Sequence, residues 1–169
     1  MNKNKELLPF YQKAKELLEY NPDTGVFTWR VSNSNRVKIG DIAGCLHKNS
    51  GYTLIRVGDK LLRAHRIAFF IVNNETPNVI DHINGDRSDN RISNLRSCTS
   101  QQNGFNSSKQ INNTSGYRGV SKAGNKWRAR IYIKNKETSL GHFDCPKEAS
   151  RVYEEKAREL HGEFYNDKI

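Results

Sequence analysis

The chain has 169 residues, enough for one ordinary domain or two small ones, and a formal net charge of +10 at pH 7. The 28 Lys and Arg residues against 18 Asp and Glu favour a polyanionic partner, because cationic side chains bind phosphates. The chain contains no run of about 18 apolar residues, so no membrane span is predicted. It also contains no basic helix with a strong apolar face, so binding to an anionic membrane is not expected.

The N-terminal part of the chain predicts a β-rich scaffold. An apolar period over residues 6–20 predicts an amphipathic helix, which the Asn-Pro-Asp-Thr-Gly segment after it ends in a turn. Short strands separated by polar turns are then predicted over residues 26–31, 41–46, 52–57 and 60–63. A short apolar helix follows over residues 64–70. We interpret His65 in this helix as a packed, hydrogen-bonded residue rather than a contact to phosphate.

The cysteines indicate a reducing compartment. Cys45, Cys98 and Cys145 are odd in number, widely scattered and without the spacing of zinc ligands. We therefore interpret them as free thiols, and expect neither disulfides nor structural zinc. The first residues also lack the apolar core of a signal peptide, so a cytoplasmic location is expected.

Residues 79–103 gather the side chains that metal-assisted phosphodiester cleavage needs. Asp81 directly precedes His82, and amide side chains follow at Asn94 and Asn103. Carboxylate and amide oxygens are hard ligands that suit Mg²⁺, and a histidine can take a proton near neutral pH. Asn, Asp, Gly and Ser are also ordinary turn residues, so any one pair alone would indicate only a loop. The inference therefore depends on all four residues occurring together in one segment at the expected spacings.

The whole segment resembles the HNH endonuclease motif, also called the ββα-metal or His-Me finger, in the branch of phage and intron-encoded homing endonucleases. The spacings fit that branch, with 94 − 82 = 12 residues from His82 to Asn94 and 103 − 94 = 9 from Asn94 to Asn103. The resemblance implies that His82 is the general base and that Asp81 and Asn103 are metal ligands. It also implies that Asn94 holds the loop and helps to orient His82. Because Asn103 supplies an oxygen where the family name has a histidine, one Mg²⁺ ion is expected, or Mn²⁺, rather than Zn²⁺.

Local patterns within this segment predict two strand ends and one helix. Residues 79–82 should form a strand that ends at the Asp-His pair, and residues 92–96 should return as a turn and short strand. Thr99 or Ser100 is the expected N-cap of a helix that places Asn103 in its first turn and ends near Asn106.

Beyond residue 106 the character of the sequence changes. Residues 107–115 are rich in Asn and Ser and have no apolar period, so they predict a linker. Three strands are predicted over residues 117–121, 126–133 and 138–143, followed by a helix that opens at Pro146. The apolar stripe expected to pack on the sheet consists of Ala149, Val152, Tyr153, Ala157 and Leu160.

The middle strand separates apolar from basic side chains. Its inward set should be Trp127, Ala129, Ile131 and Ile133. Its outward set should be Arg128, Arg130, Tyr132 and Lys134. This period of two predicts a three-stranded sheet with one face on the helix and a basic face outward.

This segment resembles the plant ethylene-response-factor (Apetala-type) DNA-binding domain, which also occurs in phage HNH endonucleases. The match rests on Tyr117-Arg118-Gly119-Val120, Lys126-Trp127, Leu140-Gly141-His142-Phe143 and the helix with Glu148, Ala149 and Ala157. In that family the sheet lies in the major groove, which a β-ribbon fits. The DNA-contacting residues implied by position are Arg118, Arg128, Arg130 and Tyr132. Departures at Ser121, Ala123 and Arg130 leave the recognition sequence open, and a merely solvated basic face is the alternative.

Together these interpretations predict an α+β chain of two domains. Residues 1–106 are expected to form an HNH endonuclease domain, with a β-rich scaffold carrying the finger at residues 79–106. A linker over residues 107–115 should lead to a DNA-binding domain at residues 116–169, a small three-stranded antiparallel sheet packed on one helix.

The expected function is metal-dependent hydrolysis of phosphodiester bonds in duplex DNA, targeted by the C-terminal domain. One finger has one hydrolytic centre, so a monomer should nick one strand, and a double-strand break would need a homodimer or two events. The family resemblance implies products with 5′-phosphate and 3′-hydroxyl ends. The expected location is the cytoplasm of a bacterial or phage-infected cell. No protein partner is evident. The alternatives are a DNA-binding regulator with an inactive finger and an RNA-processing nuclease, although an outward face richer in Arg than in aromatics favours duplex DNA.

Overall fold

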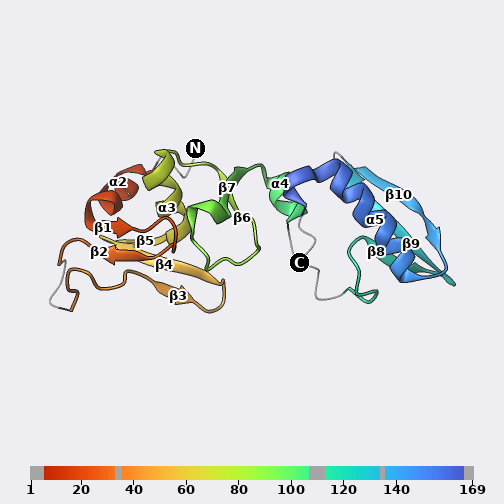
Figure 1. Ribbon diagram of the computed structural model, residues 1–169, viewed down its shortest axis with the longest axis horizontal. Coiled ribbons are helices and arrows are strands. Elements are labelled where there is room, and N and C mark those ends of the chain that lie inside the picture. Colours follow the sequence, from red (N-terminus) through yellow and green to blue (C-terminus); the bar gives the residue numbers. More distant parts are fainter. Residues whose placement is uncertain (1–5, 33–35, 107–112, 134–135, 166–169) are drawn as a thin grey trace. The chain divides into compact units, whose positions relative to one another are not determined.

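The computed structural model describes residues 6–32, 36–106, 113–133 and 136–165. It divides the chain into two compact units, residues 1–103 and 104–169. Both units mix helices with small antiparallel sheets, as the sequence predicted (Figure 1). Of the predicted linker over residues 107–115, residues 107–112 lie outside the described part of the chain.

In the first unit, a helix near the start of the described residues passes directly into a hairpin. α2 (Leu8–Leu17) is followed at once by β1 (Leu18–Tyr20), which pairs antiparallel with β2 (Phe27–Trp29). The prediction of one helix over residues 6–20 is therefore wrong at its C-terminal end. The turn decides this, because Asn21 Oδ1 accepts hydrogen bonds from two backbone N–H groups of the turn at 3.0 and 3.1 Å. Hairpin pairing then overrides the apolar period.

A second sheet and a buried helix complete the scaffold. The strands, in the order β3-β4-β5, are β3 (Cys45–His47), β4 (Tyr52–Val57) and β5 (Lys60–Arg63). α3 (Ala64–Asn73) starts where β5 ends and runs past the predicted range of 64–70 until Asn74, which has a left-handed φ of 56°. A strand was expected over residues 41–46, but only its last residues join β3, and Ile42 makes a single bridge to Thr28.

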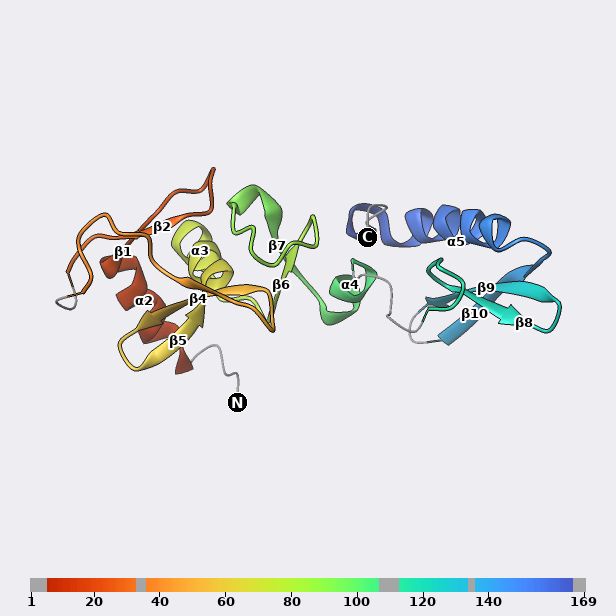
Figure 2. The same cartoon turned by 90° about the horizontal axis from the view of Figure 1, so that it is seen from below.

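The core of this unit lies between α2, α3 and the sheets (Figure 1, Figure 2). Its largest fully buried side chains are Tyr11, Leu18, Ile55, Val57, Ile67 and Phe70. Burial of each contributes roughly 1.5–3 kcal/mol, so this cluster dominates the stability of the scaffold. The rings of Tyr11 and Phe70 lie 5.6 Å apart between centroids and join α2 to α3.

The segment of the predicted finger follows α3. β6 (Val79–His82) pairs antiparallel with β7 (Leu95–Cys98), and the one-turn helix η1 (Ile92–Asn94) precedes β7. α4 (Ser100–Phe105) comes next, and it begins in the first unit and ends in the second. Thr99 caps it, because Thr99 Oγ1 accepts a hydrogen bond from the backbone N–H of Gln102 at 3.2 Å, and Gln102 Oε1 accepts one from the N–H of Thr99 at 2.8 Å.

The β1–β2 turn lies against the loop between β6 and η1. Gly25 has a φ of +72°, and a Cβ atom added there would lie 2.6 Å from the backbone nitrogen of Arg91 and 2.7 Å from the carbonyl carbon of Asn90. The hydroxyl of Tyr20 donates to the carbonyl oxygen of Asn90 at 2.7 Å, and the N–H of Ile92 donates to a carbonyl of the turn at 3.1 Å. The hairpin therefore holds this loop from the side.

The second unit is a three-stranded antiparallel sheet with a helix along one face (Figure 1, Figure 2). Its strands, in the order β10-β9-β8, are β8 (Val120–Ala123), β9 (Lys126–Ile133) and β10 (Lys136–Phe143). α5 (Pro146–His161) packs against all three strands and is followed by η2 (Gly162–Phe164). The predicted stripe fails at Leu160, which is 37% exposed near the C-terminal end of α5. Lys134 lies outside the described residues.

Among the described residues, no helix is both long and apolar enough to cross a membrane. The three cysteines all belong to this part of the chain, and they are free thiols. Cys45 and Cys145 are exposed, whereas burial raises the pKa of the half-buried Cys98 thiol.

Replacing Gly25 tests whether the hairpin supports the loop. Gly25→Ala should destabilise the first unit by about 1–2 kcal/mol for the left-handed φ, plus about 1–3 kcal/mol for the clash with backbone that cannot move cheaply. Gly40→Ala is the matched control, because its φ is +88° but nothing lies within 4 Å of an added Cβ. Urea unfolding, followed by Trp29 fluorescence in a Trp127→Phe background, measures both variants. Equal losses would show that the close approach of the two backbones contributes nothing.

Candidate active site

Asp81 and His82 end β6 inside the first unit. Each residue is only 5% exposed, although both carry polar side chains. Buried polar groups are costly unless they are paired, so such a pair at a strand end is typical of a site rather than of a scaffold. The register of the two strands places Asp81 opposite Arg96 and His82 opposite Leu95.

Asp81 forms an ion pair with Arg96 across the strands. Asp81 Oδ2 accepts hydrogen bonds from Arg96 Nε at 2.9 Å and from Nη2 at 2.7 Å. Both side chains are largely shielded from water, which strengthens the attraction. The sequence interpretation did not include Arg96. Pairing residues 79–82 with residues 95–98 would have found it, because directly opposite residues in an antiparallel pair share a face.

His82 packs against two other rings. Its ring centroid lies 4.9 Å from that of His65, edge to face, and 6.0 Å from that of Tyr52. Burial lowers the pKa of His82, while the carboxylates of Asp81, Asp86 and Asp89 oppose the shift. The imidazole is therefore neutral at physiological pH and able to accept a proton.

His65 is packed, as the sequence indicated, and is only 3% exposed. Its Nδ1 is buried with no hydrogen-bond partner among the described residues. Burial, together with the nearby His82, Arg66 and Arg63, lowers the pKa of His65 to about 2. His65 is thus an uncharged ring that supports His82 from α3.

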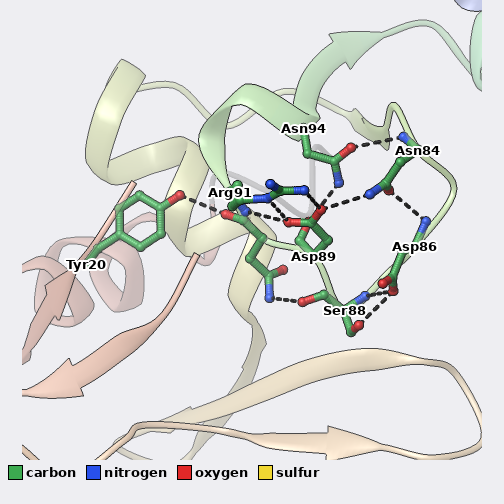
Figure 3. A network of polar contacts seen from close by, with 8 residues as sticks. Tyr20, Asn84, Asp86, Ser88, Asp89, Arg91 and Asn94 are labelled. Carbon is green, nitrogen blue, oxygen red and sulfur yellow. Dashed lines mark hydrogen bonds and ion pairs between the residues drawn. The ribbon is translucent and has the colours of Figure 1, made fainter. Parts of the chain in front are cut away.

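Asn94 closes the loop that leaves His82 (Figure 3). Its Oδ1 accepts a hydrogen bond from the backbone N–H of Asn84 at 2.9 Å, and its Nδ2 donates to the carbonyl oxygen of Asp89 at 2.9 Å. Its own carbonyl accepts the N–H of Ile83 at 2.9 Å. One buried side chain therefore fixes both arms of the loop directly after His82.

Short carboxylate bonds fill the rest of the loop, as Figure 3 shows. Asp89 accepts Arg91 Nε at 2.9 Å, Arg91 Nη2 at 2.6 Å and Asn84 Nδ2 at 2.8 Å. These bonds, led by those from Arg91, lower the pKa of Asp89 to about 2. Asp86 accepts both the N–H and the hydroxyl of Ser88, at 2.8 and 2.7 Å. The sequence suggested only a turn here.

Asn103, the second expected metal ligand, lies on α4 with an exposed side chain. Among the described residues, no group of three or more His, Cys, Asp and Glu side chains could hold a metal ion. The described residues therefore contain no metal site built entirely from such side chains. A site with few protein ligands suits Mg²⁺, which often binds through one or two carboxylates together with water and substrate phosphates. Asp81 and the amide of Asn103 are oxygen donors of that kind. The guanidinium of Arg96 already forms an ion pair with Asp81, so a bound metal ion would have to share the Asp81 carboxylate with Arg96.

In the second unit, three of the four expected DNA-contacting residues meet on one side of β9. Arg128 Nη2 and Arg130 Nη1 lie 3.3 and 2.8 Å from the carboxylate of Glu137 on β10. The hydroxyl of Tyr132 donates to the same carboxylate at 3.0 Å, and these contacts lower the pKa of Glu137. The basic side of the sheet therefore has an acidic residue at its centre, which the sequence interpretation missed although Glu137 pairs with Tyr132.

Arg118 lies elsewhere in this unit. Its Nη2 donates to the carbonyl oxygen of Phe105 at 2.9 Å, and its guanidinium lies 5.8 Å from the ring centroid of Tyr165. The side chain is half-buried. The structure therefore groups Arg128, Arg130 and Tyr132 but places Arg118 in a packing role.

Comparison with known proteins agrees with the location of this site. A family model described as HNH endonuclease matches residues 62–105. A protein of Acanthamoeba polyphaga mimivirus, named as an uncharacterized HNH endonuclease, is 34% identical over 107 residues, covering 61% of this chain and 55% of that protein. Protein 3.8 of Escherichia phage T7 is 32% identical over 87 residues, covering 50% of this chain and 71% of that protein. No solved structure matches the chain.

The burial of His65 predicts a dependence of stability on pH. The unfolded chain takes up a proton at this histidine below about pH 6.5, whereas the folded chain does so only near the lowered pKa of about 2. Its contribution to stability is therefore complete above pH 6.5 and falls by up to about 1.4 kcal/mol per pH unit on acidification. His65→Phe should remove that part of the slope. Urea unfolding from pH 7.5 down to about pH 5, followed by Trp29 in a Trp127→Phe background, measures it, and an unchanged slope would assign the proton uptake to other groups.

Proposed function

Because the chain belongs to the HNH endonuclease family, we propose that it is a metal-dependent enzyme that hydrolyses phosphodiester bonds in duplex DNA and nicks one strand. The observation that carries the proposal is the buried Asp81-His82 pair at the end of β6, followed by a loop that Asn94 holds closed. The chain spans 55% of the length of the mimivirus relative, so the activity of the whole protein is proposed on this site and not transferred from that relative.

His82 is the general base in this proposal. Its imidazole is neutral because burial lowers its pKa, and its ring packs against those of Tyr52 and His65. It takes a proton from an attacking water, whose oxygen bonds to phosphorus in line with the scissile bond. The bond from phosphorus to the 3′ oxygen breaks, the 3′ oxygen leaves with its electron pair and takes a proton from solvent water, and the products carry a 5′-phosphate and a 3′-hydroxyl. General-base assistance of this kind contributes typically about 10²–10⁴-fold to the rate.

Asp81 and Asn103 are the proposed ligands of one divalent ion, with Mg²⁺ the best match to oxygen donors and Mn²⁺ the alternative. When bound, such an ion would neutralise charge on the phosphate and on the departing oxygen. Arg96 holds Asp81 Oδ2 in place through two hydrogen bonds, so the carboxylate keeps one orientation. Asn94 positions the loop after His82 and acts through backbone groups rather than on the substrate.

We propose that the second unit targets the enzyme to DNA as an Apetala-type domain. A three-stranded antiparallel sheet backed by one helix supports this, together with Arg128, Arg130 and Tyr132 on the side of β9 away from Ala129 and Ile131. Glu137 holds both guanidiniums in the free protein, and phosphates or base edges of DNA would have to compete with it. Arg118 would contact DNA only after leaving the carbonyl of Phe105.

A DNA-binding regulator with an inactive finger is the second candidate. The Asp81–Arg96 ion pair favours it, because a guanidinium already satisfies the carboxylate that a metal ion would need. The two candidates predict different results on DNA, since a regulator binds without cutting and an endonuclease requires the metal.

His82→Ala should abolish cleavage and leave DNA affinity nearly unchanged. The measurement is nicking of supercoiled plasmid and phage DNA with Mg²⁺ or EDTA, alongside a binding assay. His47→Ala is the control, because it removes an exposed histidine of the same unit. Nicking that needs Mg²⁺, persists in the control and disappears in His82→Ala is the expected result. Binding without nicking by the unaltered protein would favour the regulator.

Arg130→Ala tests the proposed DNA-binding face. The free energy of DNA binding should weaken by about 1–3 kcal/mol if Arg130 contacts a base. If Arg130 contacts a phosphate, the slope of log K against log salt concentration should become shallower by about 1. Arg151→Ala is matched in charge and unit, but Arg151 is 74% exposed on α5, which covers the opposite side of the sheet. If both variants bind DNA like the unaltered protein at low salt, the sheet is not the DNA-binding face.

A further inference from the structure

Two arginines lie over one tyrosine ring beside the candidate base. The guanidinium carbon of Arg63 is 4.5 Å from the ring centroid of Tyr52, and that of Arg87 is 5.2 Å from the same centroid. Cation–π contacts form within about 6 Å of a ring, so both guanidiniums are held by Tyr52. We call these three side chains the arginine platform.

The fold brings the platform together from three parts of the first unit. Tyr52 begins β4, and Arg63 ends β5 opposite Leu54, which places it diagonal to Tyr52 on the same side of the sheet. Diagonal neighbours are within reach of long and aromatic side chains. Arg87 comes from the loop between β6 and η1, and its Nη1 donates to the carbonyl oxygen of Ser50 at 3.2 Å. The loop that carries Arg87 is the one that Asn94 closes.

The same tyrosine ring is part of the packing around His82. Its centroid lies 6.0 Å from that of His82 and 5.0 Å from that of His65. The platform is therefore fixed to the candidate active site by three mutually packed rings. Both guanidiniums therefore stack on a ring that itself packs against His82.

The charges of Arg63 and Arg87 are not neutralised within the described part of the chain, where neither side chain forms an ion pair with a carboxylate. Other arginines of the chain do form such pairs, namely Arg30, Arg91, Arg96, Arg128, Arg130, Arg151 and Arg158. Arg63 and Arg87 are also both exposed. Guanidiniums that stack on a ring keep their N–H groups in the plane for a phosphate. Arg63 and Arg87 are therefore exposed, held in place by a ring and not neutralised by a carboxylate, which suits them to bind an anion beside the proposed nuclease site.

We propose that Tyr52, Arg63 and Arg87 form a binding site for a backbone phosphate of the DNA strand that is cut, next to the scissile phosphate. The inference rests on the proposed nuclease function, and it assigns to the first unit its own contact with substrate. Two guanidiniums fixed near His82 hold the strand in register, so the water and the scissile bond are aligned when His82 accepts the proton.

Salt dependence of binding tests the site. Binding of a labelled duplex oligonucleotide is measured over a range of salt concentrations, with every variant in a His82→Ala background so that nothing is cut. Arg63→Gln and Arg87→Gln should each make the slope of log K against log salt shallower by about 0.9. Arg30→Gln is the control, because it removes the same charge from an arginine at the end of β2 that is paired with Glu19. Slopes for Arg63→Gln and Arg87→Gln equal to that of Arg30→Gln would overturn the proposal.

The tyrosine ring is tested without changing any charge. Tyr52→Phe keeps the ring and should bind like its parent, whereas Tyr52→Leu should weaken binding about 3–10-fold, because both guanidiniums lose their support. Circular dichroism and the thermal midpoint of each variant establish that it is folded. Equal affinities of folded Tyr52→Phe and Tyr52→Leu would show that the ring does not organise the site.

Nicking by the unaltered protein separates the two proposals. If the plasmid is nicked but the salt slopes do not change, the proposed phosphate site on the arginine platform is wrong and the nuclease proposal is supported. If no DNA is cut under any condition while the slopes change as expected, the nuclease proposal fails, and the platform remains as a phosphate site of a DNA-binding protein.

Discussion

The amide of Asn94 is the constraint on which the site depends. The chain leaves β6 at His82, makes a long polar loop and returns through η1 into β7, and only a group that both donates and accepts can close this loop at its neck. Asparagine does both with one side chain, whereas aspartate would lose the donor and alanine both functions. The loop is then held from outside by the β1–β2 hairpin, where Gly25 and Tyr20 meet the backbone of Asn90. His82 owes its position to this double support.

Charge compensation distinguishes the arginines of this basic chain. Asp81 holds Arg96 inside the site, and Glu137 holds Arg128 and Arg130 on the sheet of the second unit. A nearly buried ion pair such as Asp81–Arg96 is costly to break, because one charge would remain in a poorly solvated place. Exposed pairs such as those of Glu137 contribute little to stability and can exchange one anion for another. The chain therefore combines a fixed charge pair in the finger with exchangeable ones on the sheet.

Packed rings link the scaffold to the chemistry. His65 on α3 and Tyr52 on β4 both touch the ring of His82, so the helix and the sheet that form the core also form the wall of the site. Burial in this wall keeps His65 uncharged and lowers the pKa of His82, which suits the role of general base that we propose for His82. The removal of both imidazoles from water therefore lowers both pKa values, and at His65 it also makes the stability of the fold depend on pH.

The sequence by itself determined the local features, because they depend on neighbours along the chain. The strand that ends at Asp81 and His82, a helix cap at Thr99 or Ser100 and the period of two in β9 all follow from short-range patterns and turn chemistry, and the structure places the cap at Thr99. The family match over residues 62–105 covers the segment that these patterns single out. Tertiary structure decided the features that need partners distant in the sequence. It ended α2 at Leu17 through hairpin pairing, brought Arg96 to Asp81 through strand register, and set Tyr52 and His65 around His82. No local pattern encodes those contacts, since register and packing are settled only when the sheets and helices bury their shared core.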